Sequence, residues 1–472
     1  MFILMVVVFV LGYTAIALEH PLKVDKAASA LLIGSLTWVI YILGSSDILS
    51  LGFSRAWEEF KLSIPEGMLS NPEKAQEYIH EFIVEKEALH HLGEIAQILF
   101  FLLGAMTIVE IVDQYQGFKV ITDKITTTNK VKLLWILSFL TFFMSAALDN
   151  LTTTIVLVAL LRKLIADKET RWFFASMVVL AANAGGAWSP IGDVTTIMLW
   201  IGGQVTAGNI IAMVFIPSLV TMIIPVAILS FTMKGEVQRP DVDDNDNNEY
   251  TTLGERKFIL IFGVSALLFV PVFKTVTHLP PYMGMLFGLS LLWIVTEIIG
   301  KRKSAEDKRK LSVVAILSKV DVPTVLFFLG ILSAVASLQS AGQLDLLAKF
   351  LDDHLGNIYL INIAIGLLSS IVDNVPLVAG AMGMYEIVDP ALIEHGSYMS
   401  HFVADGTFWE LLAFCAGTGG SILIIGSAAG VAAMGMEKID FIWYLKKISL
   451  LAFIGYIAGV GAYYLQAIIL HY

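Results

Sequence analysis

The fold of this chain is decided at Asn183-Ala-Gly-Gly-Ala-Trp-Ser-Pro-Ile-Gly-Asp193. Apolar residues precede and follow this stretch, but its adjacent glycines and Pro190 cannot sustain a regular helix. Backbone carbonyl and amide groups are therefore released within an apolar region, and Asp193 places a carboxylate beside them. The pattern predicts a broken helix whose free polar groups line a cavity.

The composition of the whole chain places that break in a membrane. Of the 472 residues, 57% are hydrophobic and 15% are charged, with a mean hydropathy of +0.78. Soluble proteins carry about 25% charged residues, and roughly 20 apolar residues make one span. The net charge of -11 disfavours nucleic-acid binding, and the single Cys415 excludes an internal disulfide. We expect an all-α polytopic membrane protein that contacts the lipid bilayer and no nucleic acid.

Long apolar runs, separated by short polar segments, predict the membrane spans. We expect spans near residues 2–18, 27–44, 93–113, 206–233, 257–274, 282–300, 322–338 and 442–470. Between 132 and 202, and again between 359 and 435, the apolar runs are shorter and are broken by Asp-Asn, Gly-Gly and Pro. These two regions are expected to hold the irregular elements.

The distribution of lysine and arginine predicts the orientation. If the N-terminus lies outside, 24 of the 30 basic residues fall on the inner side, as the positive-inside rule requires. Segment 301–310 is then cytoplasmic, whereas 45–92 and 386–408 face outward. We expect a multi-pass protein of the inner (plasma) membrane of a prokaryote. The six basic residues left outside are Arg55, Lys61, Lys74, Lys86, Lys274 and Lys349.

The segment near 132–166 has basic residues at both of its ends, so both ends are expected inside. The chain must then enter the membrane and turn back, with the tip of the hairpin at Leu148–Thr152. The second arm, 151–161, is too short to span at 1.5 Å per residue. This predicts a re-entrant hairpin; the alternative is two ordinary spans with a misplaced loop.

Three short stretches of the first half recur in the second half in the same order. They are Phe100–Gly104 with Phe327–Gly330, Ser145–Asn150 with Ser369–Asn374, and Gly185-Gly186…Gly192-Asp193 with Gly419-Gly420…Gly426-Ser427. On the predicted topology the corresponding spans run in opposite directions. An inverted-topology repeat of this kind is typical of secondary transporters.

The repeat predicts the domain organisation. Residues 1–233 form the first half, with an inward-side hairpin near 132–166 and a broken helix near 171–202. Residues 234–256 form a cytoplasmic acidic linker. Residues 257–472 form the inverted second half, with an outward-side hairpin near 359–385 and a broken helix near 409–435.

Intramembrane carboxylates are functional candidates because burying a charge costs several kcal/mol. Asp149 and Asp373 lie at the predicted hairpin tips, and Asp193 follows the first glycine-rich break. The polar residues around them are Asn150, Thr152, Thr153, Asn183, Ser189, Thr195 and Thr196 in the first half, and Asn374, Thr418, Ser421 and Ser427 in the second. These hard oxygen ligands suit a small hard cation. The same carboxylates can take a proton, so cation and proton can exchange.

Several of these polar residues have an alternative structural role. Ser145, Ser369 and Thr153 could instead satisfy backbone groups freed by the breaks. Asp373 could be a hairpin cap, and Asp321 could be an interfacial charge at the end of a span. His90 and His91 with Glu94 could sense pH, or could form a solvated helix end.

The stretches Ser145-Ala-Ala-Leu-Asp-Asn-Leu-Thr-Thr-Thr154, Asn183 to Thr196, and Ser369-Ser-Ile-Val-Asp-Asn-Val-Pro376 resemble NhaD-type sodium/proton antiporters. This group belongs to the ion transporter superfamily, related to arsenite permeases and citrate or dicarboxylate carriers. The resemblance covers nearly the whole chain. It implies a homodimer without a cofactor, in which a scaffold domain supports a transport domain with two opposed hairpins and two broken helices.

The resemblance also implies the activity and the ion site. The activity would be exchange of sodium or lithium for protons by alternating access, with sodium held by Asp149 and Asp193. The implied site residues are Asp149, Asn150, Thr152, Asn183, Asp193, Thr195, Ser369, Asp373, Asn374, Thr418 and Ser421. Additional candidates are Ser145, Ser189, Thr196, Asp321 and Ser427.

Other functions remain open at this point. A sodium-coupled carboxylate or oxyanion carrier could use the same scaffold, but Asp at the hairpin tips would repel an anionic substrate. An ion channel is disfavoured by paired opposed hairpins. A membrane-embedded hydrolase would need a paired nucleophile and base, and no intramembrane Ser–His pair is evident, so we expect a protein that is not an enzyme.

Overall fold

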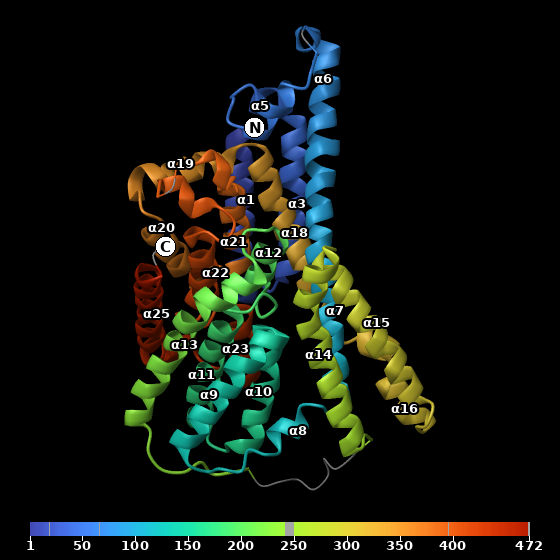
Figure 1. The fold of residues 1–472 in the computed structure, drawn as a ribbon, viewed down its shortest axis with the longest axis vertical. Coiled ribbons are helices and arrows are strands. Elements are labelled where there is room, and N and C mark those ends of the chain that lie inside the picture. Colours follow the sequence, from blue (N-terminus) through green and yellow to red (C-terminus); the bar gives the residue numbers. More distant parts are fainter. Residues whose placement is uncertain (18, 66, 241–249, 395, 471–472) are drawn as a thin grey trace. The chain divides into compact units, whose positions relative to one another are not determined.

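The computed structural model describes residues 1–17, 19–65, 67–240, 250–394 and 396–470. Every regular element within these ranges is helical (Figure 1). Eight helical segments of the described chain are long and apolar enough to cross a membrane. The predicted class, an all-α polytopic membrane protein, is therefore confirmed. Residues 241–249 of the predicted acidic linker lie outside the described residues.

The candidate spans agree closely with the apolar runs of the sequence. They are α3 (Lys26–Leu43), the continuous segment Pro72–Gln114, α9 (Lys130–Leu148), α13 (Ala207–Thr232), α14 (Leu253–Thr277), α15 (Pro281–Gly300), α18 (Val322–Ser340) and α25 (Ser449–Ile469). Pro72–Gln114 comprises α6 (Pro72–His80), a π-helical stretch (Glu81–Ala88) and α7 (Leu89–Gln114). Three apolar helices are shorter: α1 (Phe2–Ala17), α20 (Ile358–Ser369) and α21 (Asn374–Met384).

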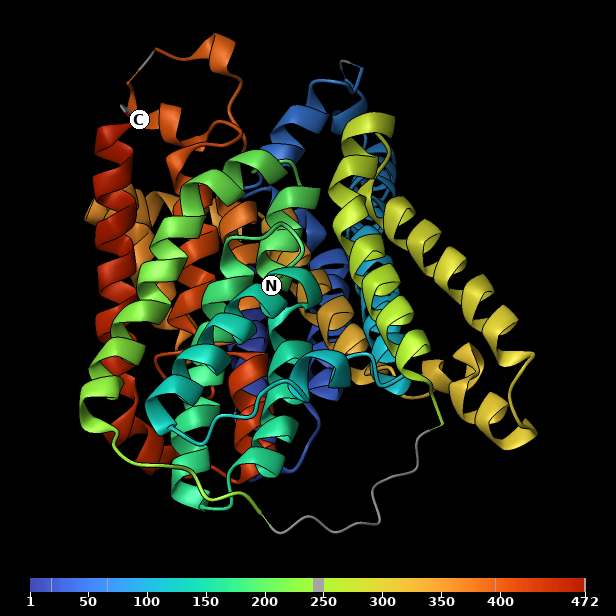
Figure 2. The same cartoon turned by 60° about the horizontal axis from the view of Figure 1, so that its bottom comes forward.

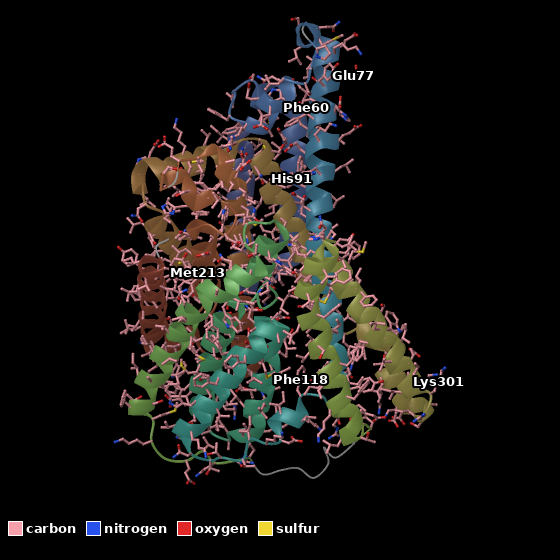
Figure 3. The ribbon with its side chains drawn as sticks, viewed as in Figure 1. Phe60, Glu77, His91, Phe118, Met213 and Lys301 are labelled. Atoms are coloured by element: carbon pink, nitrogen blue, oxygen red, sulfur yellow. The ribbon has the colours of Figure 1, made fainter. Side chains whose placement is uncertain are left out.

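The remaining α-helices are shorter or more polar. They are α2 (Glu19–Leu22), α4 (Ser45–Leu49), α5 (Arg55–Lys61), α8 (Lys119–Thr122), α10 (Asn150–Leu164), α11 (Lys168–Ala187), α12 (Val194–Ile201), α16 (Ala305–Leu311), α17 (Val313–Leu317), α19 (Gln343–Leu355), α22 (Thr407–Gly419), α23 (Ala428–Glu437) and α24 (Phe441–Lys447). Lys301, labelled in Figure 3, caps the C-terminal end of α15.

Two predicted boundaries were wrong. The expected span 442–470 is two helices, α24 and α25, which meet at Ile448, where the backbone leaves regular helical geometry with φ -116°. The second arm of the first hairpin, expected over 151–161, is the 15-residue helix α10, which continues through Arg162 and Lys163. At 1.5 Å per residue, α10 is about 22 Å long and still falls short of a hydrocarbon core of about 30 Å.

The chain forms two compact units. The first comprises Met1–Leu99, Asp321–Ile361 and Val375–Ile393; the second comprises Phe100–Val320, Asn362–Asn374 and Glu394–Tyr472. In the first unit α3 packs directly against α18. A side chain at Gly34 would place its Cβ 2.5 Å from the carbonyl oxygen of Gly330, so only glycine allows this approach. Trp38 of α3 donates to the carbonyl oxygen of Ser333 in α18 at 3.0 Å.

The second unit contains the helices of the predicted site. Helices α9, α10 and α11 pack against one another, and α11 also contacts α22 and α23 (Figure 1). Helices α13 and α25 pack against each other, as do α14 and α15, which meet at one end and diverge towards the other (Figure 2). The polar residues discussed below, apart from Asp321, belong to this unit.

Helices α9 and α10 form a hairpin. The amide of Lys130, at the start of α9, donates to Gly235 at 3.1 Å. The amide of Ala166, just beyond α10, donates to Gln238 at 2.8 Å. The start of α9 and the end of α10 therefore both contact the short segment from Gly235 to Gln238. The chain must reverse its direction between the two helices, at Asp149.

Candidate functional site

The tip of the hairpin is Asp149, which separates α9 from α10. Its backbone has φ 85° and ψ 161°, a region that almost only glycine occupies at low cost. Its carboxylate accepts from the backbone amide of Thr152 at 2.7 Å and from the Thr152 hydroxyl at 2.8 Å. Asp149 therefore caps the N-terminus of α10 from a strained position, and strain of this kind is commonly found at functional sites.

The break between α11 and α12 lies against the first hairpin. The Ser145 hydroxyl donates to the carbonyl oxygen of Ala182 at 2.6 Å, which joins α9 to α11. A Cβ at Gly185 would lie 2.2 Å from the carbonyl oxygen of Phe142. The two helices thus meet backbone to backbone, and the glycine predicted to break the helix is required for this contact.

Asp193 begins α12 directly after the break. One of its carboxylate oxygens accepts from the backbone amide of Thr195 at 3.0 Å, as in an N-cap. The Asn150 amide donates to the other oxygen at 2.8 Å, and the Asn374 amide lies 3.3 and 3.4 Å from the two. Asp193 is only 1% exposed. Asn150 and Asn374 each follow one of the two predicted hairpin-tip aspartates, and both therefore reach the carboxylate of Asp193.

Asn183 links this carboxylate cluster to the second glycine-rich break. Its side-chain oxygen accepts from Asn150 at 3.0 Å. Its side-chain nitrogen donates to the hydroxyls of Ser421 and Ser427, both at 2.9 Å. Both N–H donors and the oxygen of this buried amide are used, and residues more than 230 positions apart are joined into one network.

The second break repeats the contacts of the first. The Ser369 hydroxyl donates to the carbonyl oxygen of Ala416 at 2.8 Å, and a Cβ at Gly419 would lie 2.1 Å from the carbonyl oxygen of Gly366. Ser427 begins α23 with extended backbone and accepts from the amide of Gly430 at 3.1 Å. Ser427 thus occupies in the second break the capping position that Asp193 occupies in the first.

The other candidate residues lie in several environments. The Thr418 hydroxyl donates to Phe414 of its own helix at 2.6 Å, and that of Ser189 donates to Ala146 at 2.5 Å. Thr196 is buried in α12. Asp373 precedes Asn374 in the link between α20 and α21. Asp321 is an exposed cap of α18 in the other compact unit, where it accepts from the Thr324 amide at 3.2 Å.

The cluster of Asp193, Asn150, Asn374, Asn183, Ser421 and Ser427 carries one carboxylate and otherwise neutral groups. Asp193 accepts hydrogen bonds from the side-chain amides of Asn150 and Asn374 and from the backbone amide of Thr195, and within the described residues no lysine, arginine or histidine pairs with it. A buried carboxylate without a counter-charge is costly in a membrane. A monovalent cation or a proton would neutralise it.

Resident metal binding fits this site poorly. Nowhere in the described ranges do three His, Cys, Asp or Glu side chains gather as a metal site would require. One carboxylate with amide and hydroxyl oxygens offers hard ligands of low total charge. Such a set suits reversible binding of a small ion, with carboxylate, amide and hydroxyl oxygens replacing its hydration shell.

Two buried acids were missed by the sequence reasoning. Glu437, at the end of α23, accepts from Arg162 Nε at 2.7 Å and from Arg171 Nε at 2.8 Å. Glu410, in α22, contacts Asn209 and Tyr463. Both residues end or interrupt apolar runs, and that pattern could have marked them as intramembrane carboxylates.

A buried polar centre built at helix breaks inside a polytopic helical protein defines a membrane transporter. The family model described as "Citrate transporter" matches residues 7–399. The chain belongs to this family of transporters.

Named relatives extend this result. The chain is 46% identical over 462 residues to "Sodium/proton antiporter 1" of Arabidopsis thaliana, covering 97% of this chain and 71% of the relative. It is 42% identical over 460 residues to "Sodium/proton antiporter 2" of the same plant, covering 97% and 98%. It is 29% identical over 494 residues to the "Na(+)/H(+) antiporter NhaD" of Alkalimonas amylolytica, covering 99% and 91%. The resemblance to NhaD-type antiporters is therefore confirmed.

Proposed function

We propose that the protein exchanges sodium or lithium for protons across a membrane by alternating access. The cation and the proton compete for buried aspartate, above all Asp193, with Asp149 as a second carboxylate at the hairpin tip. One observation carries this proposal: the Asp193 carboxylate is 1% exposed and is contacted only by neutral donors. The names of the antiporter relatives support the same chemistry.

The remaining ligands follow from the network. Asn150, Asn183 and Asn374 supply amide oxygens after modest side-chain rotation, and Ser421 and Ser427 supply hydroxyl oxygens. We include Thr152, Thr195, Ser369, Asp373 and Thr418 as the outer part of the proposed site. The corresponding contacts of the two breaks support an inverted repeat whose halves open the site to opposite sides in turn.

A sodium-coupled citrate or oxyanion carrier is the second candidate, because the family model is described as a citrate transporter. Such a carrier needs positive groups around an anionic substrate. The Asp193 cluster offers a negative charge instead, and this favours a cation as the transported species.

Inside-out or reconstituted vesicles with an imposed pH gradient would test the proposal. Sodium, lithium, potassium and citrate are added in turn while a pH-sensitive dye reports the gradient. We expect sodium or lithium to dissipate it and citrate to leave it unchanged. Dissipation by citrate with sodium present, and not by sodium alone, would establish the carboxylate carrier instead.

We further propose that the protein is a homodimer of the plasma membrane of a prokaryote, with its N-terminus outside and residues 301–310 in the cytoplasm. The uneven distribution of basic residues supports this orientation. In a Cys415→Ala background, Ser304→Cys should react with an impermeant thiol reagent only after the inner side is exposed. Reaction from outside would contradict the orientation.

A further inference from the structure

Glu410 is a buried carboxylate that the cation site does not use. It lies in the first turn of α22, where every residue from Thr407 to Gly419 is buried, and it has no exposed surface. One carboxylate oxygen accepts from the side-chain amide of Asn209 in α13, and the other accepts from the Tyr463 hydroxyl of α25. Three helices of the same compact unit therefore meet at this acid.

The Glu410 carboxylate accepts its hydrogen bonds from neutral groups. Over the described ranges, its side-chain partners are the neutral Asn209 and Tyr463, and it forms no ion pair. Glu437 shows the contrast, since two arginines neutralise that equally buried acid. A buried carboxylate that lacks a counter-charge is stable only if it can take a proton.

The two partners of Glu410 suit both protonation states. When Glu410 is ionised, the Tyr463 hydroxyl and the Asn209 amide donate to it. When Glu410 is protonated, its own hydroxyl becomes a donor, and the tyrosine oxygen can turn to accept because a phenol does both. The carboxyl group of Glu410 can therefore gain and lose a proton while it keeps a hydrogen bond to each of its two partners.

Tight packing fixes the geometry of the three helices. A Cβ at Gly459 of α25 would lie 2.1 Å from the Thr221 hydroxyl of α13 and 2.5 Å from the Phe414 ring of α22. One turn from the cluster, Gln466 of α25 donates to the carbonyl oxygen of Met213 at 3.2 Å. The hydrogen bonds at Glu410 are thus held by the helix packing around them.

Helix α22 connects Glu410 to the cation site. Gly417 lies seven residues further along, which is about two turns and about 10 Å of helix, on nearly the same face. A Cβ at Gly417 would lie 3.7 Å from a carboxylate oxygen of Asp193. Charge on Glu410 therefore acts on Asp193 through a buried region in which salt screens weakly.

We propose that Glu410 is a second proton-binding site of this protein, formed by α13, α22 and α25 and electrically coupled to Asp193. The coupling to transport rests on the proposed antiport function, whereas the proton binding does not. The other titratable groups near this end of α22 are Asp405, which accepts from Thr206 at 2.5 and 2.8 Å, and His401. Neither of them contacts the carboxylate of Glu410.

Difference infrared spectroscopy on the purified full-length protein, titrated in pH, tests the proton site without any transport. The carbonyl stretch of protonated carboxylic acids should grow as pH falls, and the part of it that belongs to Glu410 should be lost in Glu410→Gln while the part that belongs to Asp193 remains. In Tyr463→Phe the band should appear at higher pH, because the ionised form has lost a donor. The control Asp405→Asn, which changes a neighbouring half-buried acid, should keep the band of Glu410. A pH titration of the band in Glu410→Gln that matched that of the wild type would overturn the proposal.

Sodium-driven proton exchange tests the coupling. Glu410→Gln should retain the wild-type exchange rate within about threefold at alkaline pH. Its exchange activity should persist to a pH about half a unit lower than in the wild type, because loss of a nearby negative charge makes Asp193 harder to protonate. An unchanged pH profile would overturn the coupling. If wild type showed no sodium exchange while the infrared band still depended on Glu410, the antiport function would fail and the proton site would stand.

Discussion

The two glycine-rich breaks have nearly the same backbone contacts and different charge. At the α11–α12 break a Cβ on Gly185 would lie 2.2 Å from a carbonyl oxygen, and at the α22–α23 break a Cβ on Gly419 would lie 2.1 Å from one. The residue that begins the following helix is Asp193 in the first case and Ser427 in the second. Close packing therefore fixes the breaks, whereas the capping residue decides which one carries the charge.

This asymmetry explains why one cluster serves both halves. Asn183 reaches from the charged break to Ser421 and Ser427 of the neutral break, and Asn374 reaches back to Asp193. The second half contributes neutral ligands to a carboxylate of the first. In this cluster the charge comes from Asp193, so this carboxylate would neutralise one monovalent cation or one proton, with Asp149 as the second carboxylate of the proposed site.

Of the substitutions considered, Asp193→Asn should cause the largest loss of sodium exchange. The substitution replaces the anionic ligand by a neutral amide of similar size, so the variant should fold but exchange sodium at least about 100-fold more slowly, the effect expected of about 2.7 kcal/mol in ligand binding. Vesicle exchange assays measure this. The matched control Asp167→Asn changes an exposed cap of α11, which accepts from Thr170 at 2.7 Å, and should keep the normal rate. Normal exchange by the Asp193→Asn variant would show that the cation site lies elsewhere in the protein.

Gly185→Ala and Gly419→Ala should destabilise the folded protein by about the same amount. These two substitutions test whether the two breaks are packed alike. Either Cβ would collide with a backbone carbonyl oxygen, so we expect at least about 1–3 kcal/mol of destabilisation and a marked loss of folded protein. Thermal unfolding in detergent measures the effect. Gly461→Ala, where a Cβ meets nothing within 4 Å, is the control and should remain stable. Damage at only one break would show that their packing differs.

The sequence predicts the breaks because glycine, proline and a capping residue act locally. The Gly-Gly and Gly-Asp193 spacing was enough to anticipate where α11 ends and α12 begins. Apolar runs of about 20 residues likewise anticipated most span candidates, since length and hydropathy are also local properties. The division of 442–470 at Ile448 had no proline or glycine to signal it, and it was missed.

The partners of each side chain depended on long-range packing and could not be predicted. The sequence pattern made Asp149 and Asp193 equally strong candidates for the ion site. In the structure Asp149 accepts from Thr152 of the helix that it caps, whereas Asp193 also accepts hydrogen bonds from asparagines of two distant segments. The Glu410 cluster joins residues from three helices separated by about 50 to 200 positions. No local pattern specifies which helices will lie side by side.

Sodium affinity should depend on pH if the cation and the proton share the charged break. Protonation removes the anionic ligand, so the sodium dissociation constant should rise about tenfold per pH unit below the pH at which the site protonates. Coupling between two carboxylates would make the dependence steeper. Sodium titrations of proteoliposome exchange between about pH 6 and 9 measure it. A sodium dissociation constant that stays the same across this pH range would show that the proton and the cation bind at separate sites. The charged break would then not bind both ions.

Ser427→Ala should have the smallest effect, because it removes a neutral ligand and leaves the charge in place. The change deletes the cap of α23 and one of the two hydroxyls that hold Asn183. Loss of a serine cap lowers stability by about 0.5–2 kcal/mol. Loss of one hydroxyl partner of Asn183 removes a hydrogen bond of about 0.5–1.5 kcal/mol, so sodium affinity should weaken by about 2- to 13-fold. Ser427→Thr retains a capping hydroxyl and should recover part of the affinity. A loss as large as that of Asp193→Asn would mean that the neutral break holds the cation as directly as the charged one, and the functional asymmetry between them would be rejected.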